Sequence, residues 1–346
     1  MSNISFSQVF SELTSTGLSP ERVRQVFDAI LAGTWTPTQI AGLLVALRFA
    51  GESAEVLAAA AASMRAAMVR VEHGLPRLLD TCGTGGDHSG SLNLSTGAAV
   101  IVAAAGVPVG KHGNRAASSR TGTADVLEAM GVPIDVPAPS HRQILAEANI
   151  TFFFAQAHHP AMRHAGPVRK ELGIRTIFNC LGPLANPAGA THQLLGSFDD
   201  GVRTTLARAL ATLGTERAWV VRSTDGMDEV SPYAPTRVTV LERGRVDELT
   251  IAPEDFGIPT SPAGAAQGGD PTNNAKVLEA VLRGEPHPSV DAFVLNAAAA
   301  LVVADGVEPR AAAARAREAI ASGAAWTTLE RWRSAAQRAR PASKES

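Results

Sequence analysis

This sequence of 346 residues has few cysteines and few aromatic residues, and its positive and negative charges nearly balance. Its two cysteines, Cys82 and Cys180, lie far apart and outside any metal-ligand spacing, which excludes a disulfide framework and favours a reducing cytoplasm. Aromatic residues make up only 5% of the chain, with one tyrosine. The core must therefore consist mostly of Ala, Leu and Val, drawn from a hydrophobic content of 45%.

The charge balance and the short apolar runs argue against two classes of partner. With 31 basic and 33 acidic residues, the formal net charge is −2, which gives no electrostatic reason to expect nucleic acid or an anionic membrane. The longest apolar stretches, such as 297–304, are too short to span a bilayer, and no signal peptide is apparent at the N-terminus. We therefore expect a cytoplasmic protein that binds neither nucleic acid nor a membrane.

Residues 1–74 show helical patterns only. Ser19 stands as an N-cap before a proline, Thr36 begins a capping box, and Ser53 can cap a third helix. Nothing in this stretch resembles a chemical site. We predict a small helical domain whose apolar faces serve packing or a dimer surface.

From Leu78 onward, short apolar strands alternate with helices, and this predicts a mostly parallel sheet covered by helices. The expected strands begin at 78 and continue with 107–109, 150–154, 193–196 and 218–221, and the expected helices are 95–105, 123–130, 140–148, 158–172, 201–213, 273–284, 289–304, 308–321 and 325–339. Residues 237–251 predict an antiparallel hairpin that turns at Arg243-Gly244. The fold class is α/β, with a small helical domain (1–74) and a large domain (75–346).

Residues 78–123 contain two consecutive turns from a strand into a helix. Gly83, Gly85 and Gly86 follow the first strand, where the absence of Cβ atoms lets backbone N–H groups converge on one point. Polar residues at 93–96 then stand at the start of an apolar helix, whose N-terminus favours an anion. The second turn, predicted as a loop, carries Lys111 and His112 together with Asn114, Arg115, Ser118 and Ser119. Two such turns in tandem predict a site for a highly anionic, phosphate-bearing ligand.

Two further groups of residues suggest a metal at first sight. Asp228-Glu229 follows the strand 218–221, and adjacent carboxylates in a loop either face solvent or face a cation. Their place at the carboxyl edge of the same sheet favours Mg²⁺, which proteins hold through one or two carboxylates and phosphate oxygens. The histidine-rich run 158–164 lacks zinc-type ligand spacing, so we expect packing at a helix start there.

Three motifs together resemble the signature of the anthranilate phosphoribosyltransferases, the tryptophan-pathway enzymes whose fold is shared with pyrimidine nucleoside phosphorylases. They are Cys82-Gly-Thr-Gly-Gly-Asp87, Asn93-Leu-Ser-Thr96 and Lys111-His-Gly-Asn-Arg-Ala-Ala-Ser-Ser119. The resemblance covers nearly the whole chain. It implies that the segment 160–189 joins the small helical domain, that the protein is a homodimer, and that Mg²⁺ is the cofactor. It also implies transfer of the phosphoribosyl group of 5-phosphoribosyl 1-diphosphate to the amine of anthranilate, with release of pyrophosphate.

The resemblance also implies which residues bind each ligand. Anthranilate would contact Gly83, Asn114 and Arg169, since a guanidinium can bind a carboxylate bidentately. Magnesium would contact Ser95, Asp228 and Glu229. The residues implied for 5-phosphoribosyl 1-diphosphate are Gly83, Gly86, Asp87, Ser91, Asn93, Leu94, Ser95, Thr96, Lys111, His112, Gly113, Asn114, Arg115, Ala116, Ala117, Ser118, Ser119 and Thr123. No general base is assigned, because aromatic amines are weakly basic, and His112 is expected to be structural.

The sequence departs from the family pattern at three positions. His88 stands where the family usually has Gly, which predicts altered loop mobility or an added polar contact. Leu92 replaces the usual Phe, and Met227 replaces a frequent Leu, and both are apolar exchanges that mainly change packing. None of the three removes an implied ligand contact.

Two rival functions belong to other classes. A pyrimidine nucleoside phosphorylase of the same fold binds free phosphate and has no need of an acidic metal pair, so Asp228-Glu229 and Arg169 favour the transferase. A non-catalytic nucleic-acid-binding relative should have a basic surface and a degraded glycine loop. This chain has a net charge of −2 and an intact Gly83–Asp87.

Overall fold

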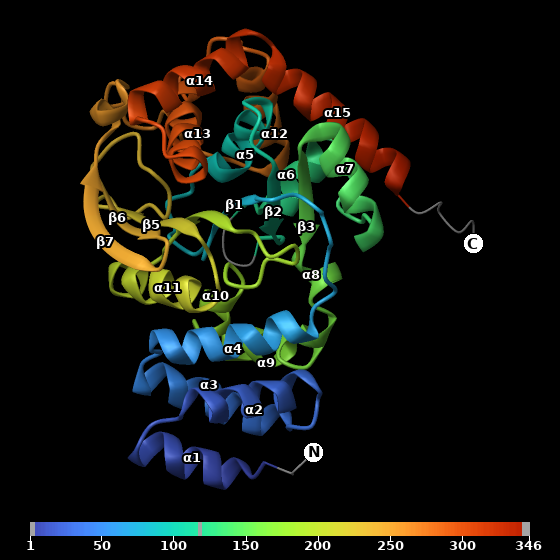
Figure 1. Ribbon diagram of the computed structural model, residues 1–346, viewed down its shortest axis with the longest axis vertical. Coiled ribbons are helices and arrows are strands. Elements are labelled where there is room, and N and C mark those ends of the chain that lie inside the picture. The colour runs from blue at the N-terminus through green and yellow to red at the C-terminus, as the bar shows by residue number, and fades with distance from the viewer. Residues whose placement is uncertain (1–3, 117–119, 341–346) are drawn as a thin grey trace.

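The computed structural model describes residues 4–116 and 120–340. Four helices form the N-terminal end of the molecule: α1 (Phe6–Ser15), α2 (Pro20–Leu31), α3 (Pro37–Ala50) and α4 (Ala54–Ala67). The expected caps are present, because Ser19 and Ser53 accept backbone hydrogen bonds at the starts of α2 and α4, and Thr36 and Gln39 form the capping box of α3. Figure 1 shows these helices stacked at one end of the long axis.

A single seven-stranded sheet lies in the middle of the molecule. Its strands are β1 (Leu79–Gly83), β2 (Val109–Gly113), β3 (Ile150–Phe154), β4 (His192–Gly196), β5 (Arg217–Ser223), β6 (Thr236–Glu242) and β7 (Arg245–Ile251). The order is β3-β2-β1-β4-β5-β6-β7, and β1 to β5 pair in parallel while β6 and β7 form the expected antiparallel hairpin. The chain turns from one half of the sheet to the other between β1 and β4, which is where ligands bind in open sheets of this kind.

Helices cover both faces of this sheet (Figure 1). One face carries α5 (Leu94–Ala104) packed on α13, and the other carries α11 (Asp200–Thr212), which also contacts α4. The helices outside the β3–β4 segment are completed by α6 (Thr123–Ala129), α7 (His141–Ala148), α12 (Pro271–Leu282), α13 (Val290–Asp305), α14 (Pro309–Ala321) and α15 (Ala324–Ala339). The sheet therefore separates two cores, an alanine-rich one around α5 and α13 and a leucine-rich one between α11 and the N-terminal helices.

The segment between β3 and β4 differs from the expected helix over 158–172. It contains short helices α8 (Ala155–His158), α9 (Gly166–Leu172) and α10 (Phe178–Leu181), with a 3₁₀ turn (Pro160–Arg163) after α8. Pro160 lacks the N–H that a continuing helix needs, and a proline at the start of α9 begins a new helix. The expectation of one continuous helix was wrong for this reason.

The second strand also differs from its prediction. It runs over Val109–Gly113 rather than 107–109, and it pairs with β3 from Val109 to Gly113. Lys111 and His112 were expected in a loop, but they are strand residues and are 1% and 5% exposed. A lysine in a strand core is tolerated only where buried carboxylates compensate its charge, which the sequence pattern alone does not reveal.

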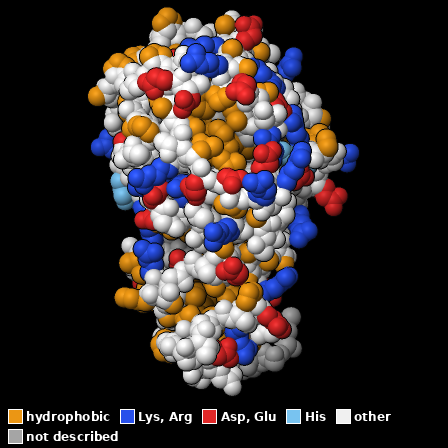
Figure 2. Space-filling model, turned by 60° about the vertical axis from the view of Figure 1, so that its left-hand side comes forward, with side chains coloured by type: hydrophobic (Ala, Val, Ile, Leu, Met, Phe, Trp, Pro, Cys, Tyr) orange, Lys and Arg blue, Asp and Glu red, His pale blue; other side chains and the backbone are white. Residues whose placement is uncertain are grey.

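Figure 2 shows acidic and basic side chains interspersed on the face that it views, without a field of one sign. Among the described helices, none is both long and apolar enough to cross a membrane alone, and only the sharply bent pair of α13 and α14 meets that test jointly.

Candidate active site at the carboxyl edge of the sheet

The glycine loop after β1 lies against the loop after β5. Gly85 and Gly86 have φ values of +68° and +79°, which side chains other than glycine rarely adopt. A Cβ atom on Gly83 would lie 2.9 Å from Asp228 Oδ2, and the N–H of Gly85 donates to that same oxygen at 3.2 Å. Glycine is therefore required at 83 by the close approach of Asp228, and at 85 and 86 by the backbone conformation.

The N-terminus of α5 faces the same carboxylates. The Ser95 N–H donates to Glu229 Oε1 at 3.1 Å, so the helix start already holds a negative charge. Thr96 contributes a buried hydroxyl oxygen that has no hydrogen-bond partner among the described residues. The N–H groups at the helix start are thus already bonded, and the Thr96 hydroxyl is the polar group there that a ligand could satisfy.

Three carboxylates, Asp87, Asp228 and Glu229, form an acidic cluster. The N–H of Asp228 donates to Asp87 Oδ2 at 3.2 Å, which joins the glycine loop to the acidic pair. Burial, reinforced by Asp87 and Glu229, raises the pKa of Asp228 well above its usual range. Burial also raises the pKa of Glu229 to about 7. Buried like charges of this kind are stabilised by a cation.

Lys111 is the buried cation of the site. Its Nζ donates to the Thr81 carbonyl oxygen and, at 3.3 Å, to Ser95 Oγ. Burial lowers its pKa, and the neighbouring carboxylates of Asp80 and Glu229 oppose that shift. One ammonium therefore serves two carboxylates and stands between β1 and the start of α5.

Asp80 supports this arrangement, and the sequence reasoning missed it. The side chain is fully buried; its Oδ1 accepts from the His112 N–H at 3.0 Å and its Oδ2 accepts from Asn186 Nδ2 at 2.9 Å. Asn186 also donates to the Gly110 carbonyl at 2.8 Å. An acidic residue inside an apolar strand was the available signal. His112 itself is held by an Nδ1 hydrogen bond of 3.1 Å to the Gly182 carbonyl.

The donor set fits Mg²⁺ better than a metal held by protein groups alone. Within residues 4–116 and 120–340, no three or more His, Cys, Asp or Glu side chains are grouped to hold an ion by themselves. Asp228 and Glu229 instead offer two half-buried carboxylates beside glycine-loop amides, and Mg²⁺ takes this kind of site together with phosphate oxygens.

The histidine-rich run is packed, as the sequence predicts. His158 Nδ1 lies 2.9 Å from the Val69 carbonyl oxygen, and His158 Nε2 lies 3.3 Å from His141 Nε2. His141 Nδ1 is in turn 2.8 Å from Thr151 Oγ1. The Val69 carbonyl can only accept, so His158 donates from Nδ1 and its Nε2 accepts a hydrogen bond from His141 Nε2. His141 Nδ1 then accepts a hydrogen bond from the Thr151 hydroxyl.

The remaining expected residues lie around this centre without joining it. Arg115 pairs with Glu128 at 2.6 Å and with Asp125 at 3.1 Å, so α6 holds its guanidinium in this structure. Arg169, in α9, lies over the Phe178 ring with its Cζ 5.4 Å from the centroid, and burial lowers its pKa. The other expected ligand contacts lie at the end of β2 and in the loops and helix starts that follow β1 and β2: Ser91, Asn93, Leu94, Gly113, Asn114, Ala116 and Thr123. The remaining three, Ala117, Ser118 and Ser119, lie outside the described residues.

The departures from the family pattern have visible consequences. His88 has a φ of +59°, a left-handed conformation that a non-glycine residue adopts at a cost. Leu92 and Met227 are 2% and 5% exposed within the core around α5 and α13, which agrees with a packing role.

Comparison with known proteins connects both parts of the chain to one type of enzyme. Residues 75–326 match the model of the glycosyl transferase family, a/b domain, and residues 13–68 match that of the glycosyl transferase family, helical bundle domain. An anthranilate phosphoribosyltransferase of Methylobacterium radiotolerans is 50% identical over 91% of this chain and 92% of its own length.

Solved structures of similar proteins share the fold. The anthranilate phosphoribosyltransferase of Thermus thermophilus superimposes with a TM-score of 0.90 at 42% identity, covering 95% of this chain and 99% of its own. The enzyme of Saccharomyces cerevisiae, in complex with PRPP and Mg, gives a TM-score of 0.88 at 27% identity, covering 96% and 98%.

Proposed function

We infer the function of this site from the premise that the chain belongs to the anthranilate phosphoribosyltransferase family. It is a pentosyltransferase of tryptophan biosynthesis, and it transfers the phosphoribosyl group of 5-phosphoribosyl 1-diphosphate to the amine of anthranilate. The products are N-(5-phosphoribosyl)anthranilate and pyrophosphate. The observation that carries this function is the half-buried acidic pair Asp228-Glu229, whose pKa values are raised, beside a glycine loop and the buried Lys111.

Mg²⁺ is the cofactor, and we propose that Asp228, Glu229 and Ser95 hold it. The raised pKa values of both carboxyl groups support this assignment, because each of them gains from a nearby cation. When bound, Mg²⁺ neutralises charge on the diphosphate and makes it a better leaving group.

The diphosphate and ribose would lie on the two strand-to-helix turns. Backbone amides of the loop Gly83–Asp87, the start of α5 at 93–96 and the ammonium of Lys111 supply positive potential on one side. The unpartnered Thr96 hydroxyl supports this placement, since a buried oxygen without a partner gains from a ligand. The residues after β2, from Asn114 to Ala116, and Thr123 at the start of α6 would close the other side.

Anthranilate would bind through Gly83, Asn114 and Arg169. The guanidinium of Arg169 is partly buried and lies over an aromatic ring, so a substrate carboxylate would compensate its charge. The amine nitrogen then attacks C1 of the ribose, and the C1–oxygen bond breaks with its electron pair leaving on the diphosphate. The amine loses one proton after attack, and we assign no side chain as its general base.

We propose that residues 1–74 with the segment 160–189 form a small domain that closes over the sheet edge. Phe27 of α2 lies 5.6 Å from Phe178 of α10 between ring centroids, and Arg65 of α4 donates to the Leu184 carbonyl at 2.7 Å. The segment thus packs on the N-terminal helices although it is distant in sequence. Closure would exclude water, which otherwise hydrolyses the activated ribose.

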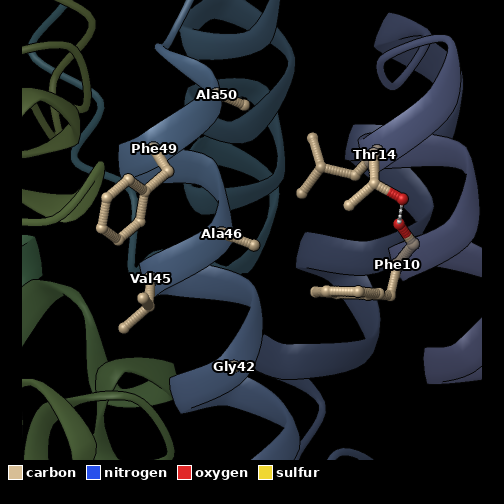
Figure 3. Close-up of a pocket in the computed structure, with 8 residues that line it drawn as sticks. Phe10, Thr14, Gly42, Val45, Ala46, Phe49 and Ala50 are labelled. Atoms are coloured by element: carbon tan, nitrogen blue, oxygen red, sulfur yellow. Dashed lines mark hydrogen bonds between the residues drawn. The ribbon is translucent and has the colours of Figure 1, made fainter.

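We further propose that the enzyme is a homodimer formed through its helical end. An apolar groove of about 570 Å³ lies between α1 and α3, where Figure 3 shows Ala46 and Ala50 facing Phe10 and Thr14 across it. Phe49 on α3 is 89% exposed and Phe10 on α1 is 43% exposed. Exposed aromatic side chains beside a groove support a second copy of this chain as the occupant.

The oligomer is tested by Phe49→Glu, which places a charge on that face. We expect the variant to sediment as a monomer where the wild type sediments as a dimer, and Arg243→Glu in the distant hairpin turn to leave the dimer intact. A wild type that sediments as a monomer at micromolar concentration would contradict the dimer. We also propose a cytoplasmic location, which the two buried, unpaired cysteines support.

The reaction is tested by the fluorescence of anthranilate mixed with protein, 5-phosphoribosyl 1-diphosphate and Mg²⁺. We expect a loss of signal that requires all components and that the double variant Asp228→Asn/Glu229→Gln abolishes. An unchanged signal with wild-type protein would overturn the transferase function, and phosphorolysis of pyrimidine nucleosides would then be measured.

A further inference from the structure

Arg175 reaches from the connection between α9 and α10 to the glycine loop after β1. Its Nη2 donates a hydrogen bond to the Gly86 carbonyl oxygen. Its guanidinium also stacks on the Phe198 ring, with Cζ 4.0 Å from the ring centroid. In the described part of the chain, its partners are therefore a carbonyl and an aromatic ring, and its positive charge faces the loop.

Phe198 is a fixed support for this guanidinium. Its backbone N–H donates to Thr84 Oγ1 at 2.8 Å, and its carbonyl oxygen accepts from Arg222 Nη1. Phe198 follows β4, which lies next to β1 where the order of the strands changes direction. The ring thus holds the Arg175 guanidinium against the glycine loop from the side of β4.

The contact at Gly86 determines the orientation of one peptide group. In a trans peptide, the carbonyl of one residue and the N–H of the next point to opposite sides, and the described chain has no cis peptide. Holding the Gly86 carbonyl toward Arg175 therefore turns the Asp87 N–H to the opposite side of the loop. A Cβ on Gly86 would lie 3.0 Å from Arg175 Nη2, so only glycine permits this contact without displacement.

We propose that Arg175 is a positioning residue for the diphosphate of 5-phosphoribosyl 1-diphosphate. Its guanidinium, supported by Phe198, keeps the Gly86–Asp87 peptide in the orientation that binds the diphosphate. The inference rests on the proposed function of this site. It also links the helical end to the loop, because the connection that carries Arg175 continues into α10, which packs on α2 through Phe178.

The test compares Arg175→Gln with Lys170→Gln, which removes a positive charge from an exposed position on α9. We expect Arg175→Gln to raise the KM for 5-phosphoribosyl 1-diphosphate, and the inhibition constant of pyrophosphate, by about tenfold or more, as for loss of a charge-assisted hydrogen bond. The KM for anthranilate should stay within about twofold, since Arg175 contacts Gly86 and none of the residues proposed for anthranilate.

Two further variants separate positioning from mere stability. Arg175→Lys keeps the charge and should recover part of the KM, while Phe198→Leu keeps apolar bulk and should raise the same KM by about threefold. A purely structural role would lower the melting temperature and kcat without separating the two KM values. If Arg175→Gln does not fold, these two variants carry the comparison.

The inference is overturned if Arg175→Gln has the same KM for 5-phosphoribosyl 1-diphosphate and the same inhibition constant of pyrophosphate as Lys170→Gln. If Arg175→Gln does not fold, the same result with Arg175→Lys and Phe198→Leu overturns it. That result, obtained with an active wild type, leaves the proposed function intact. A wild type that consumes neither substrate would instead overturn the proposed function itself.

Discussion

Two groups of buried titratable side chains flank the same sheet and behave in opposite ways. The histidine pair, His141 and His158, has hydrogen-bond partners at each ring nitrogen within the protein, and burial lowers both pKa values. The acidic cluster, Asp87, Asp228 and Glu229, brings like charges together, and burial raises the pKa of Asp228 and Glu229. The histidine pair is complete without a ligand, whereas the acidic cluster gains from an added cation.

This difference shows why ligand-type residues in a row are a poor sign of a metal site. The run 158–164 contains three histidines, yet His158 binds the Val69 carbonyl and the neighbouring His141 ring rather than a metal. Asp228 and Glu229 are only two residues, but they lie opposite a glycine loop and a helix start. Repulsion between neighbouring carboxylates, rather than the number of possible ligands, distinguishes the acidic cluster from the histidine pair.

The largest expected effect comes from removing Lys111, the buried cation beside the acidic cluster. Lys111→Met removes the ammonium that donates to the Thr81 carbonyl oxygen and to Ser95 Oγ. Hydrogen bonds from a charged group contribute about 1.5–3 kcal/mol each, so we expect a loss of about 3–5 kcal/mol of unfolding free energy. Urea denaturation measures it, with the exposed Lys276→Met as the control for lysine removal. A loss below about 1 kcal/mol would mean that the acidic cluster does not depend on Lys111.

The next prediction concerns how the unfolding free energy changes with pH because of Glu229 in the acidic cluster. Because burial raises the pKa of Glu229 from 4.5 to about 7, its contribution to stability is fully present below pH 4.5 and is lost as the pH rises through 7. This loss amounts to about 3 kcal/mol in metal-free protein. We expect Glu229→Gln, unfolded with urea in the presence of a chelator, to lack this decline. A parallel decline in both proteins would contradict the assignment.

For the histidine pair, the unfolding free energy should change with pH in the opposite direction. Burial lowers the pKa of His141 from 6.5 to about 3, so its contribution to stability is present above pH 6.5 and is lost as the pH falls. Between pH 6.5 and pH 5 this loss is about 2 kcal/mol. In His141→Gln, which does not titrate, the unfolding free energy should fall less steeply over that range. An unchanged slope would show that His141 is not the group responsible.

The smallest effect concerns the hydroxyl at the edge of the acidic cluster. Ser95→Ala removes the oxygen that accepts from Lys111 Nζ at 3.3 Å and that we propose as a magnesium contact. We expect the Mg²⁺ concentration at half-maximal activity to rise about fivefold, corresponding to about 1 kcal/mol. The same Mg²⁺ requirement in variant and wild type would remove Ser95 from the metal site.

Much of the architecture follows from local patterns in the sequence. Alternating strands and helices predict the parallel part of the sheet, and Arg243-Gly244 marks the hairpin turn. The glycines at 83–86 predict a close approach of backbone, and the caps at Ser19, Thr36 and Ser53 predict the helix starts. These features depend on neighbours in the chain, which is why they can be recognised without a structure.

What the sequence determined by itself is the type of each turn and cap, the sheet class and the resemblance that its motifs carry. Only the tertiary structure decided that Lys111 is a buried strand residue, that Asp80 and Asn186 support it, and that Arg175 meets Gly86. The reason is that the cost of burying a charge depends on partners that lie far away in sequence, here 31 residues for Lys111 and Asp80 and 89 for Arg175 and Gly86. Those partners are brought together only when the strands pair and the two turns meet at one edge of the sheet.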